Sequence, residues 1–530
     1  MNLKYCIASL SVVLTMSSCG NFLEEYSQDH DYVRTWTDLN ELLIGDCYTP
    51  VSYSNYYYTY SNKGMFLHLF SDEVEEQNGH LGNTVMGYNS HSYMFGCLTW
   101  QRRVGINETG TSYRSENATW TQMYKYINVA NNILANVEDV PQQQDSEIAG
   151  ANYVRGQAHF LRAFYYFWLT NVYGQPYNPS TASSDLGVPL KTSKEVEDKI
   201  FSRNTVEECY GLILDDLLKA EKEMALAKSI RRRSLYRADS VSVQLLLSRV
   251  YLYMQNWEKA AEYARKVIDV HPALQNLNDD ASYFASLDNP ETIFTMGGDD
   301  LPNSMQYAGQ SLRVSNQLYN AYKENDLRKS QWFWKYASFQ GITKAKEYDQ
   351  YSQYGKDHPS YYYMRYLENR SQRPVSSLFW LRSGEAYLNL AEAEAYMGHE
   401  DKAREAVNTL RKSRFQKSAP DAELTSTGSQ LITDIRNERK LDLVCEGHRW
   451  FDLRRYRVCS VQPEKISITH NFTLYVEETD DAIIETRQFV LTEDDPSWTA
   501  PIPNEVLEYN VGMPNNGNID RTYTVVETEE

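Results

Sequence analysis

The stretch YMQNWEKA at residues 253–260 returns, with substitutions, as YMGHEDKA at residues 396–403. Each copy follows a long apolar segment with helical period and opens a second such segment, with alanines where the two would cross. A helix, a tight turn and a second helix that meet at small residues form the unit of tetratricopeptide-like repeats. Because stacked units share one core, the two copies predict a mostly α-helical scaffold of helical hairpins.

Other segments carry the same helical period. Residues Ala158, Leu161, Tyr165, Trp168 and Val172 recur at alternating spacings of three and four, which places them on one helical face. This helix is expected to end near Gly174, with Pro176 just beyond, and the next to begin at a capping box from Thr205 to Glu208. The pattern predicts helical pairs over residues 117–270 and 377–455.

The intervening stretches differ in composition. Residues 45–115, 273–375 and 460–530 hold the glycine pair Gly297-Gly298, prolines and short alternating runs such as residues 466–468 and 489–491. Such composition is typical of loops with short strands or hairpins. Because binding residues often lie on loops held by a rigid scaffold, we expect the ligand side of the molecule there.

The N-terminus indicates export. A short apolar run from Tyr5 to Met16 has the length of a signal-peptide core and is followed by Ser17, Ser18 and Cys19. This arrangement resembles a lipobox, which predicts a leader over residues 1–18 and lipid attachment at Cys19 of a mature unit spanning residues 19–530. The alternative is an ordinary cleaved leader with a chance cysteine.

The composition narrows the partner. The formal net charge of −19 argues against nucleic acid as the ligand, because its phosphates bind to a basic protein surface. The chain has 42 Tyr against 17 Phe, and 10 Trp. Flat rings with polar edges suit sugars, whose C–H faces stack on them, although most of these rings could equally fill helix interfaces.

The cysteines indicate neither a disulfide framework nor a metal site. Beyond the leader and Cys19, they are Cys47, Cys97, Cys209, Cys445 and Cys459. Their number is odd and none are paired at the short spacing of zinc ligands. We therefore expect buried free thiols and no cofactor.

Several ordered motifs resemble those of the SusD/RagB family of outer-membrane nutrient-binding lipoproteins. They are residues 22–24 after Cys19, the Phe70–Glu73 stretch, residues 155–166 with 171–174, residues 436–439 with 446–455, and Pro501-Ile502-Pro503 with Asn515-Asn516. The resemblance implies a SusD-like fold and a lipid-anchored protein that faces the cell surface. It further implies that such a protein captures an oligosaccharide or polysaccharide and delivers it to a SusC-like TonB-dependent outer-membrane transporter, without catalysis.

The same resemblance suggests where the glycan would bind. The matching windows of this chain hold Trp100, Arg102, Asn107, Asn303, Tyr307 and Trp332. Trp100 is the preferred stacking platform, whereas a buried strand position is an equally good interpretation of Trp332.

Two alternatives remain open. A secreted glycoside hydrolase would share the aromatic, acidic and exported character, but it needs a pair of carboxylates in a cleft. Residues Glu446, His448, Arg449 and Asp452 could be taken for acid–base groups, although a network of paired structural charges is the favoured interpretation. The second alternative is a repeat adaptor that binds only proteins.

Overall fold

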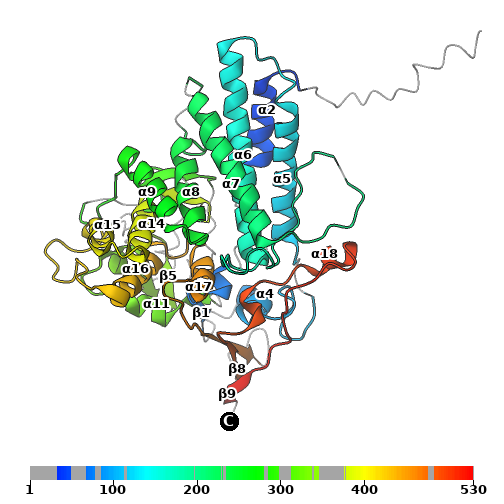
Figure 1. Ribbon diagram of the computed structural model, residues 1–530. Helices are drawn as coiled ribbons and strands as arrows, with labels where there is room; N and C mark the ends of the chain where they lie inside the picture. The colour runs from blue at the N-terminus through cyan, green and yellow to red at the C-terminus, as the bar shows by residue number, and fades with distance from the viewer. Residues whose placement is uncertain are drawn as a thin grey trace, which may run out of the picture.

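A computed structural model confirms the mostly α-helical, tetratricopeptide-like fold (Figure 1). It describes residues 33–48, 67–77, 85–112, 116–195, 197–227, 229–230, 234–279, 284–297, 312–336, 339–344, 375–376, 378–475 and 483–528. The predicted leader and Cys19 lie outside these ranges.

Four helices stand side by side as an upright bundle (Figure 1). They are α2 (Trp36–Leu42), which continues into a π-helical turn η1 (Leu43–Cys47), α5 (Ala118–Asn136), α6 (Asp145–Tyr173) and α7 (Val206–Leu226). Helix α6 ends at Tyr173 with Gly174 as its C-cap, as predicted, and nearly every residue after Ile148 is buried in it. The capping box predicted for α7 is present, since Thr205 Oγ1 accepts from the Glu208 amide at 3.2 Å and the Thr205 amide donates to Glu208 Oε2 at 2.8 Å.

The two copies of the repeat form the predicted hairpins. The first joins α8 (Ser240–Tyr253) to α9 (Trp257–Val270), and the second joins α14 (Ser383–Tyr396) to α15 (Glu400–Lys412). Helix α14 also packs against α8, α9 and α16 (Gly428–Asp442), which α17 (Arg449–Arg457) follows. The alanines at the crossings are buried: Ala260, Ala261, Ala264, Ala403 and Ala406.

The two hairpin turns have the same backbone conformation. Gln255 and Gly398 hold equivalent positions and have φ of 61° and 77°. Glycine adopts this left-handed region without cost, whereas glutamine does not. The Gln255 side chain has a compensating role, because its Nε2 donates to the Val458 carbonyl at 2.9 Å and its Oε1 accepts from the Ser460 amide at 2.8 Å. The first turn therefore ties the hairpin to the segment after α17.

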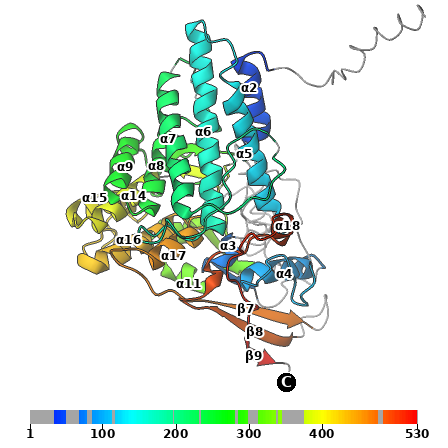
Figure 2. The same cartoon turned by 45° about the vertical axis from the view of Figure 1, so that its right-hand side comes forward.

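Short antiparallel strands connect distant parts of the chain. The pairs are β1 (Val74–Glu76) with β3 (Leu312–Val314), β2 (Thr292–Thr295) with β6 (Trp380–Arg382), and β4 (Phe333–Tyr336) with β5 (Phe339–Ile342). A three-stranded sheet of β7 (Ile468–Tyr475), β8 (Ile483–Leu491) and β9 (Thr524–Thr528) lies at the end of the molecule opposite α2 (Figure 2).

The expected loop regions also contain helices. These are α3 (Leu67–Phe70), α4 (Val85–Leu98), α11 (Asn316–Ala321), α12 (Leu327–Trp332), the 3₁₀ turn η3 (Pro496–Trp498) and α18 (Asn504–Tyr509). Helix α4 is the main departure from the sequence analysis. Every residue from Met94 to Leu98 is buried, so this part of the helix has no polar face from which a helical period could be recognised.

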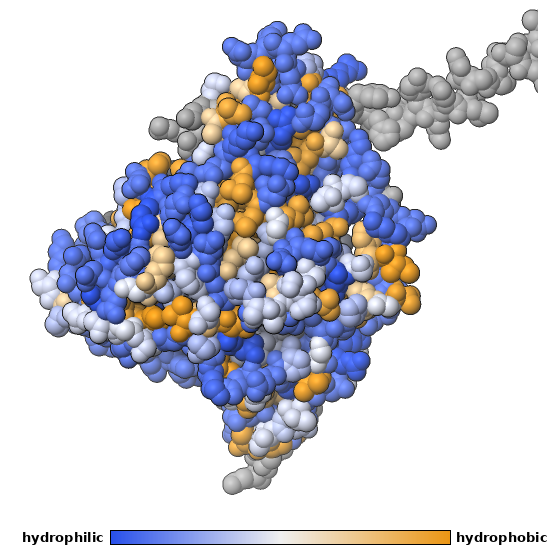
Figure 3. All heavy atoms as spheres, viewed as in Figure 1, coloured by the Kyte–Doolittle hydropathy of each residue, from blue (hydrophilic) through white to orange (hydrophobic). Residues whose placement is uncertain are grey.

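Hydrophilic residues cover most of the face seen in Figure 3, with apolar residues in small groups. Among the described residues, no helix combines the length and the apolar character that a bilayer crossing requires.

Candidate ligand-binding site

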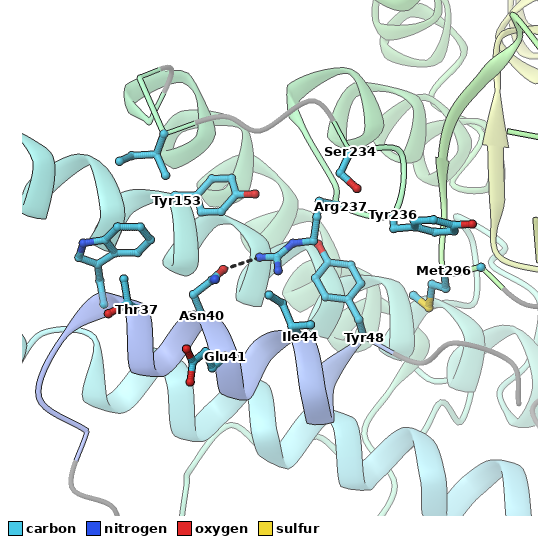
Figure 4. A pocket seen from close by; sticks show the side chains of 13 residues that line it. Thr37, Asn40, Glu41, Ile44, Tyr48, Tyr153, Ser234, Tyr236, Arg237 and Met296 are labelled. Atoms are coloured by element: carbon cyan, nitrogen blue, oxygen red, sulfur yellow. Dashed lines mark hydrogen bonds between the residues drawn. The ribbon is translucent and has the colours of Figure 1, made fainter. Parts of the chain in front are cut away.

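A cavity of about 750 Å³ opens between the bundle and the loops that precede α8 and follow β2 (Figure 4). We call it the Arg237 cavity. Residues from four separate parts of the chain line it: Trp36, Thr37, Asn40, Glu41, Ile44, Tyr48, Tyr153, Ile230, Ser234, Tyr236, Arg237, Met296 and Gly297. Its volume is in the range of ordinary small-molecule sites.

Helix α2 supplies one wall. Thr35 and Asp38 form a capping box at its start. From α2 and the turn after it, Trp36, Asn40 and Ile44 line the cavity. The half-buried indole of Trp36 lies directly on Gly150 of α6, where a Cβ would come within 2.2 Å of the indole Cδ2. Glycine at position 150 is therefore what allows the ring to rest against α6.

Arg237 is held at the centre of the cavity. Its Nε donates to Gln157 Oε1 at 2.6 Å and its Nη2 donates to Asn40 Oδ1 at 2.8 Å. The guanidinium also lies over the rings of Tyr48 and Tyr153, at 4.9 and 5.5 Å from their centroids. These partners are neutral, so the positive charge is positioned by amides and rings.

Tyr48 completes this arrangement. Its hydroxyl donates to Gln157 Oε1 at 2.7 Å and accepts from the Ala238 amide at 3.1 Å. Burial raises the pKa of the Tyr48 hydroxyl, which therefore stays neutral. Gln157 thus accepts from both Tyr48 and Arg237, and it couples α6 to the loop before α8.

Tyr236 and Gly297 form the opposite rim. Gly297 has φ of 77°, and a Cβ there would come within 2.7 Å of Cε1 of Tyr236. The half-buried Tyr236 ring therefore depends on glycine beneath it. In Figure 4 the rings of Tyr236 and Tyr48 and the Met296 side chain border the same space.

The cavity suits a ligand with apolar faces and many hydroxyls. Ring faces of Trp36 and Tyr236 offer apolar contact, while Asn40, Ser234 and Arg237 offer hydrogen-bonding groups. Among the described residues of the lining there is no His or Cys, and Glu41 carries the single carboxylate. In the described part of the chain, the one group with metal-ligand spacing lies outside this lining.

The structure places Trp100 in the core and not at the Arg237 cavity. Trp100 is 2% exposed, stacks on His470 with centroids 4.7 Å apart, and donates from Nε1 to the Phe70 carbonyl at 3.0 Å. The expectation that its face is open to a sugar is therefore corrected: both its ring and its polar edge are occupied by the core. Trp332 is also buried, against Phe284, but it is the last residue of helix α12 and does not lie on a strand.

The remaining predicted contacts divide into two kinds. Arg102 is exposed, and Asn107 is half-buried in a turn that its own Oδ1 stabilises by accepting from the Thr111 amide at 2.9 Å. Neither lines the Arg237 cavity. Asn303 and Tyr307 lie outside the described residues. Sequence reasoning missed Trp36 and Arg237, although the Thr35–Asp38 capping box could have located α2.

The charged stretch from Glu446 to Arg455 is a paired network. Glu446 accepts from Arg382 Nε at 2.9 Å and also pairs with Lys344, while Asp452 accepts from Arg439 at 2.8 Å and from Arg455 at 2.8 Å. All six side chains are buried. The acid–base interpretation of this stretch therefore lacks an open site.

His448 in the same stretch is neutral. Burial first, and then the neighbouring positive charges of Arg249, Arg439, Arg382 and Lys344, hold the pKa of His448 well below its usual value. A neutral buried imidazole beside paired charges is a structural component of this network.

The fold and the cavity define a class: a helical-hairpin protein with a ring-lined cavity. Two family models match this chain, one described as "Starch-binding associating with outer membrane" over residues 65–252 and one described as "SusD family" over residues 275–518. The chain belongs to the SusD/RagB family.

Curated relatives agree with this assignment. The chain is 27% identical over 381 residues to SusD-like protein P2 of Formosa agariphila, a match that covers 64% of this chain and 72% of the relative. It is 24% identical over 388 residues to SusD-like protein P38 of the same organism, with the same shares covered.

Solved structures share the fold. A SusD-like carbohydrate binding protein of Bacteroides vulgatus matches with a TM-score of 0.62 and 21% identity, covering 91% of this chain and 97% of that chain. A SusD superfamily protein of Bacteroides thetaiotaomicron matches with a TM-score of 0.63 and 20% identity, covering 91% and 100%.

Proposed function

We propose that this protein is a non-catalytic glycan-capture lipoprotein of the outer membrane. Anchored through Cys19 at the cell surface, it binds an oligosaccharide or a polysaccharide end at the Arg237 cavity and delivers it to a SusC-like TonB-dependent transporter. The matching family model, described as starch-binding and associated with the outer membrane, supports the ligand class and the location.

The cavity lining is the observation that carries this proposal. Trp36 and Tyr236 are held half-buried over glycines, so their rings keep a fixed orientation with a face near the cavity. Arg237 and Asn40 present fixed polar groups between them. Rigid rings with a few placed polar groups are what a sugar needs for recognition at low entropic cost.

The neighbouring sequence supports the same surface. Tyr48 and Gly297, which line the cavity, directly precede residues 49–66 and 298–311 in the chain. These segments contain the tyrosine-rich stretch from Tyr53 to Tyr60 and the predicted contacts Asn303 and Tyr307.

The carboxyl groups at this cavity argue against glycoside hydrolysis there. Retaining and inverting glycosidases use two carboxyl groups about 5–10 Å apart. Among the described residues that line the cavity, Glu41 alone carries a carboxylate. Capture without turnover therefore fits the lining better than hydrolysis.

A blocking variant tests the site. Ser234 lines the cavity and is half-buried, so Ser234→Trp fills the space without removing a core side chain. Purified protein is titrated calorimetrically with a panel of neutral and acidic oligosaccharides. We expect at least one ligand to bind the wild type and to bind Ser234→Trp at least ~10-fold more weakly, about 1.4 kcal/mol.

Ser183→Trp is the matched control, because Ser183 is exposed and outside the cavity. It should bind as the wild type does. Equal binding by Ser234→Trp would remove the cavity from the proposal. Binding of no glycan, together with capture of a soluble protein partner, would favour the adaptor alternative, and release of reducing ends by purified protein would favour the hydrolase.

A further inference from the structure

Three side chains with metal-ligand chemistry meet in the core, away from the Arg237 cavity. They are His68 of α3, Glu73 just before β1 and Cys445 in the turn after α16. One ligand atom of each lies within 4.8 Å of the others. Their exposures are 1%, 2% and 0%, so the cluster is sealed by the surrounding core.

The cluster is held in place by its own hydrogen bonds. Glu73 Oε1 accepts from the Cys445 amide at 2.7 Å, and Glu73 Oε2 faces His68 Nδ1 at 3.0 Å. Cys445 has φ of 57°, a left-handed conformation that is costly for a residue with a Cβ. The Cys445 backbone is therefore held in a strained conformation at the point where its thiol lies beside the Glu73 carboxylate and the His68 imidazole.

Two features are not accounted for by packing alone. Nε2 of His68 is buried without a hydrogen-bond partner in the described part of the chain, which carries a desolvation cost. Glu73 is a buried carboxylate whose only ion-pair partner within the described residues is His68. Lys344 is a cation whose charge acts on the Cys445 thiol, but it is already paired with Glu446.

We propose that His68, Glu73 and Cys445 form a buried structural site for a thiophilic divalent cation, with Zn²⁺ as the best fit. Imidazole, carboxylate and thiolate are all zinc ligands. With metal–ligand bonds of about 2.0–2.3 Å, a tetrahedral site separates its ligand atoms by roughly 3–4 Å. The widest pair would need to close by about 1 Å.

Charge also favours a divalent ion. One carboxylate and one thiolate neutralise Zn²⁺, and the neutral imidazole adds no charge, so the core would hold no net charge at this point. On binding, the S–H bond of Cys445 breaks, a Zn–S bond forms and the proton leaves to solvent, without any oxidation or reduction.

The site would join the two stretches of the chain that match the two family models. His68 and Glu73 lie in the stretch matched over residues 65–252, whereas Cys445 lies in the stretch matched over residues 275–518. A cation held by all three would bind the native state and not the unfolded chain. It would therefore stabilise the native contact between α3 and the turn after α16.

The experiment uses the untagged protein, stripped with chelator and dialysed. Elemental analysis after equilibration with Zn²⁺ should give about one equivalent that survives gel filtration, and Tm should rise with free zinc. Co²⁺ in place of Zn²⁺ should give the near-ultraviolet sulfur-to-cobalt charge-transfer absorption, which identifies a thiolate ligand without any substitution.

Cys445→Ser should lose that absorption and bind Zn²⁺ at least ~100-fold more weakly, since changes even to outer groups of metal sites cost 10–100-fold. Cys459→Ser is the matched control, because Cys459 is also a buried thiol but lies outside the cluster. Absence of tight Zn²⁺, or of the cobalt–thiolate absorption in folded wild-type protein, overturns the proposal. Glycan binding by the same preparation is measured separately, because the metal proposal and the proposed glycan binding can fail independently.

Discussion

Asp72 and Arg449 form a two-pronged ion pair between residues 377 positions apart in the chain. Arg449 Nε donates to Oδ1 and Nη2 donates to Oδ2, each at 2.7 Å. Burial alone would raise the pKa of Asp72, but the charge and hydrogen bonds of Arg449 outweigh it and hold that pKa below its ordinary value. The pair therefore joins the Phe70–Glu73 stretch to the start of α17.

Removing one partner of this pair should destabilise the protein more than removing both. Arg449→Met leaves Asp72 without its cation, and we expect a loss of about 2–3 kcal/mol in the free energy of unfolding, because a largely buried charge is left unpaired. Urea unfolding of Arg449→Met, Asp72→Asn and the double variant measures the coupling. Strictly additive losses in the double variant would show that the pair contributes nothing beyond its separate packing.

The helical hairpins could be predicted from the sequence because their signals are local. Apolar period, crossing alanines and the capping box at Thr205 all lie within a few residues of the elements they define. Helix α4 could not, since its later half is buried on every side and has no polar face.

The site was harder to predict because it depends on long-range contacts. The sequence motif suggests that the Trp100 ring is exposed, yet in the fold it stacks on His470, which lies 370 residues later in the chain. The Arg237 cavity forms only when α2, α6 and two distant loops come together. No spacing within the chain encodes those contacts, whereas the family motifs could be recognised without them.

Trp100→Ala should therefore act on stability. Removal of a buried indole leaves a cavity against His470 and removes the hydrogen bond to the Phe70 carbonyl, and we expect a loss of about 3–5 kcal/mol in the free energy of unfolding. Trp100→Phe, which keeps a ring, should lose less. Calorimetric titration of the folded protein should give a glycan affinity unchanged from that of the wild type. A large loss of affinity with little loss of stability would restore Trp100 to the site.

His470 should make stability depend on pH. Burial lowers its pKa from 6.5 to about 4 in the folded protein, although its hydrogen bond to the Leu98 carbonyl partly opposes this. Between these two values the unfolded chain binds a proton that the native state does not, so stability falls as pH drops from about 6.5 towards 4.

The expected size is about 2 kcal/mol between roughly pH 7 and pH 5, from 1.36 kcal/mol per pKa unit. Urea unfolding at several pH values measures it, and His470→Gln should show a shallower pH dependence than the wild type over this range. The buried His448 remains in both proteins, so the difference between them isolates His470. Identical slopes would mean that His470 is not held neutral.

Two helical glycines give a matched test of the Trp36 wall. A Cβ at Gly150 would meet the Trp36 ring at 2.2 Å, whereas a Cβ at Gly211 of α7 has nothing within 4 Å. Gly150→Ala should force the indole off α6, costing about 1–3 kcal/mol and shifting Trp emission, and weakening glycan binding if Trp36 is a contact. Gly211→Ala should leave binding unchanged and stabilise the protein by up to ~1 kcal/mol, because alanine favours the helix. Similar effects of both variants would mean that helix propensity, and not the contact between Gly150 and Trp36, governs this wall of the cavity.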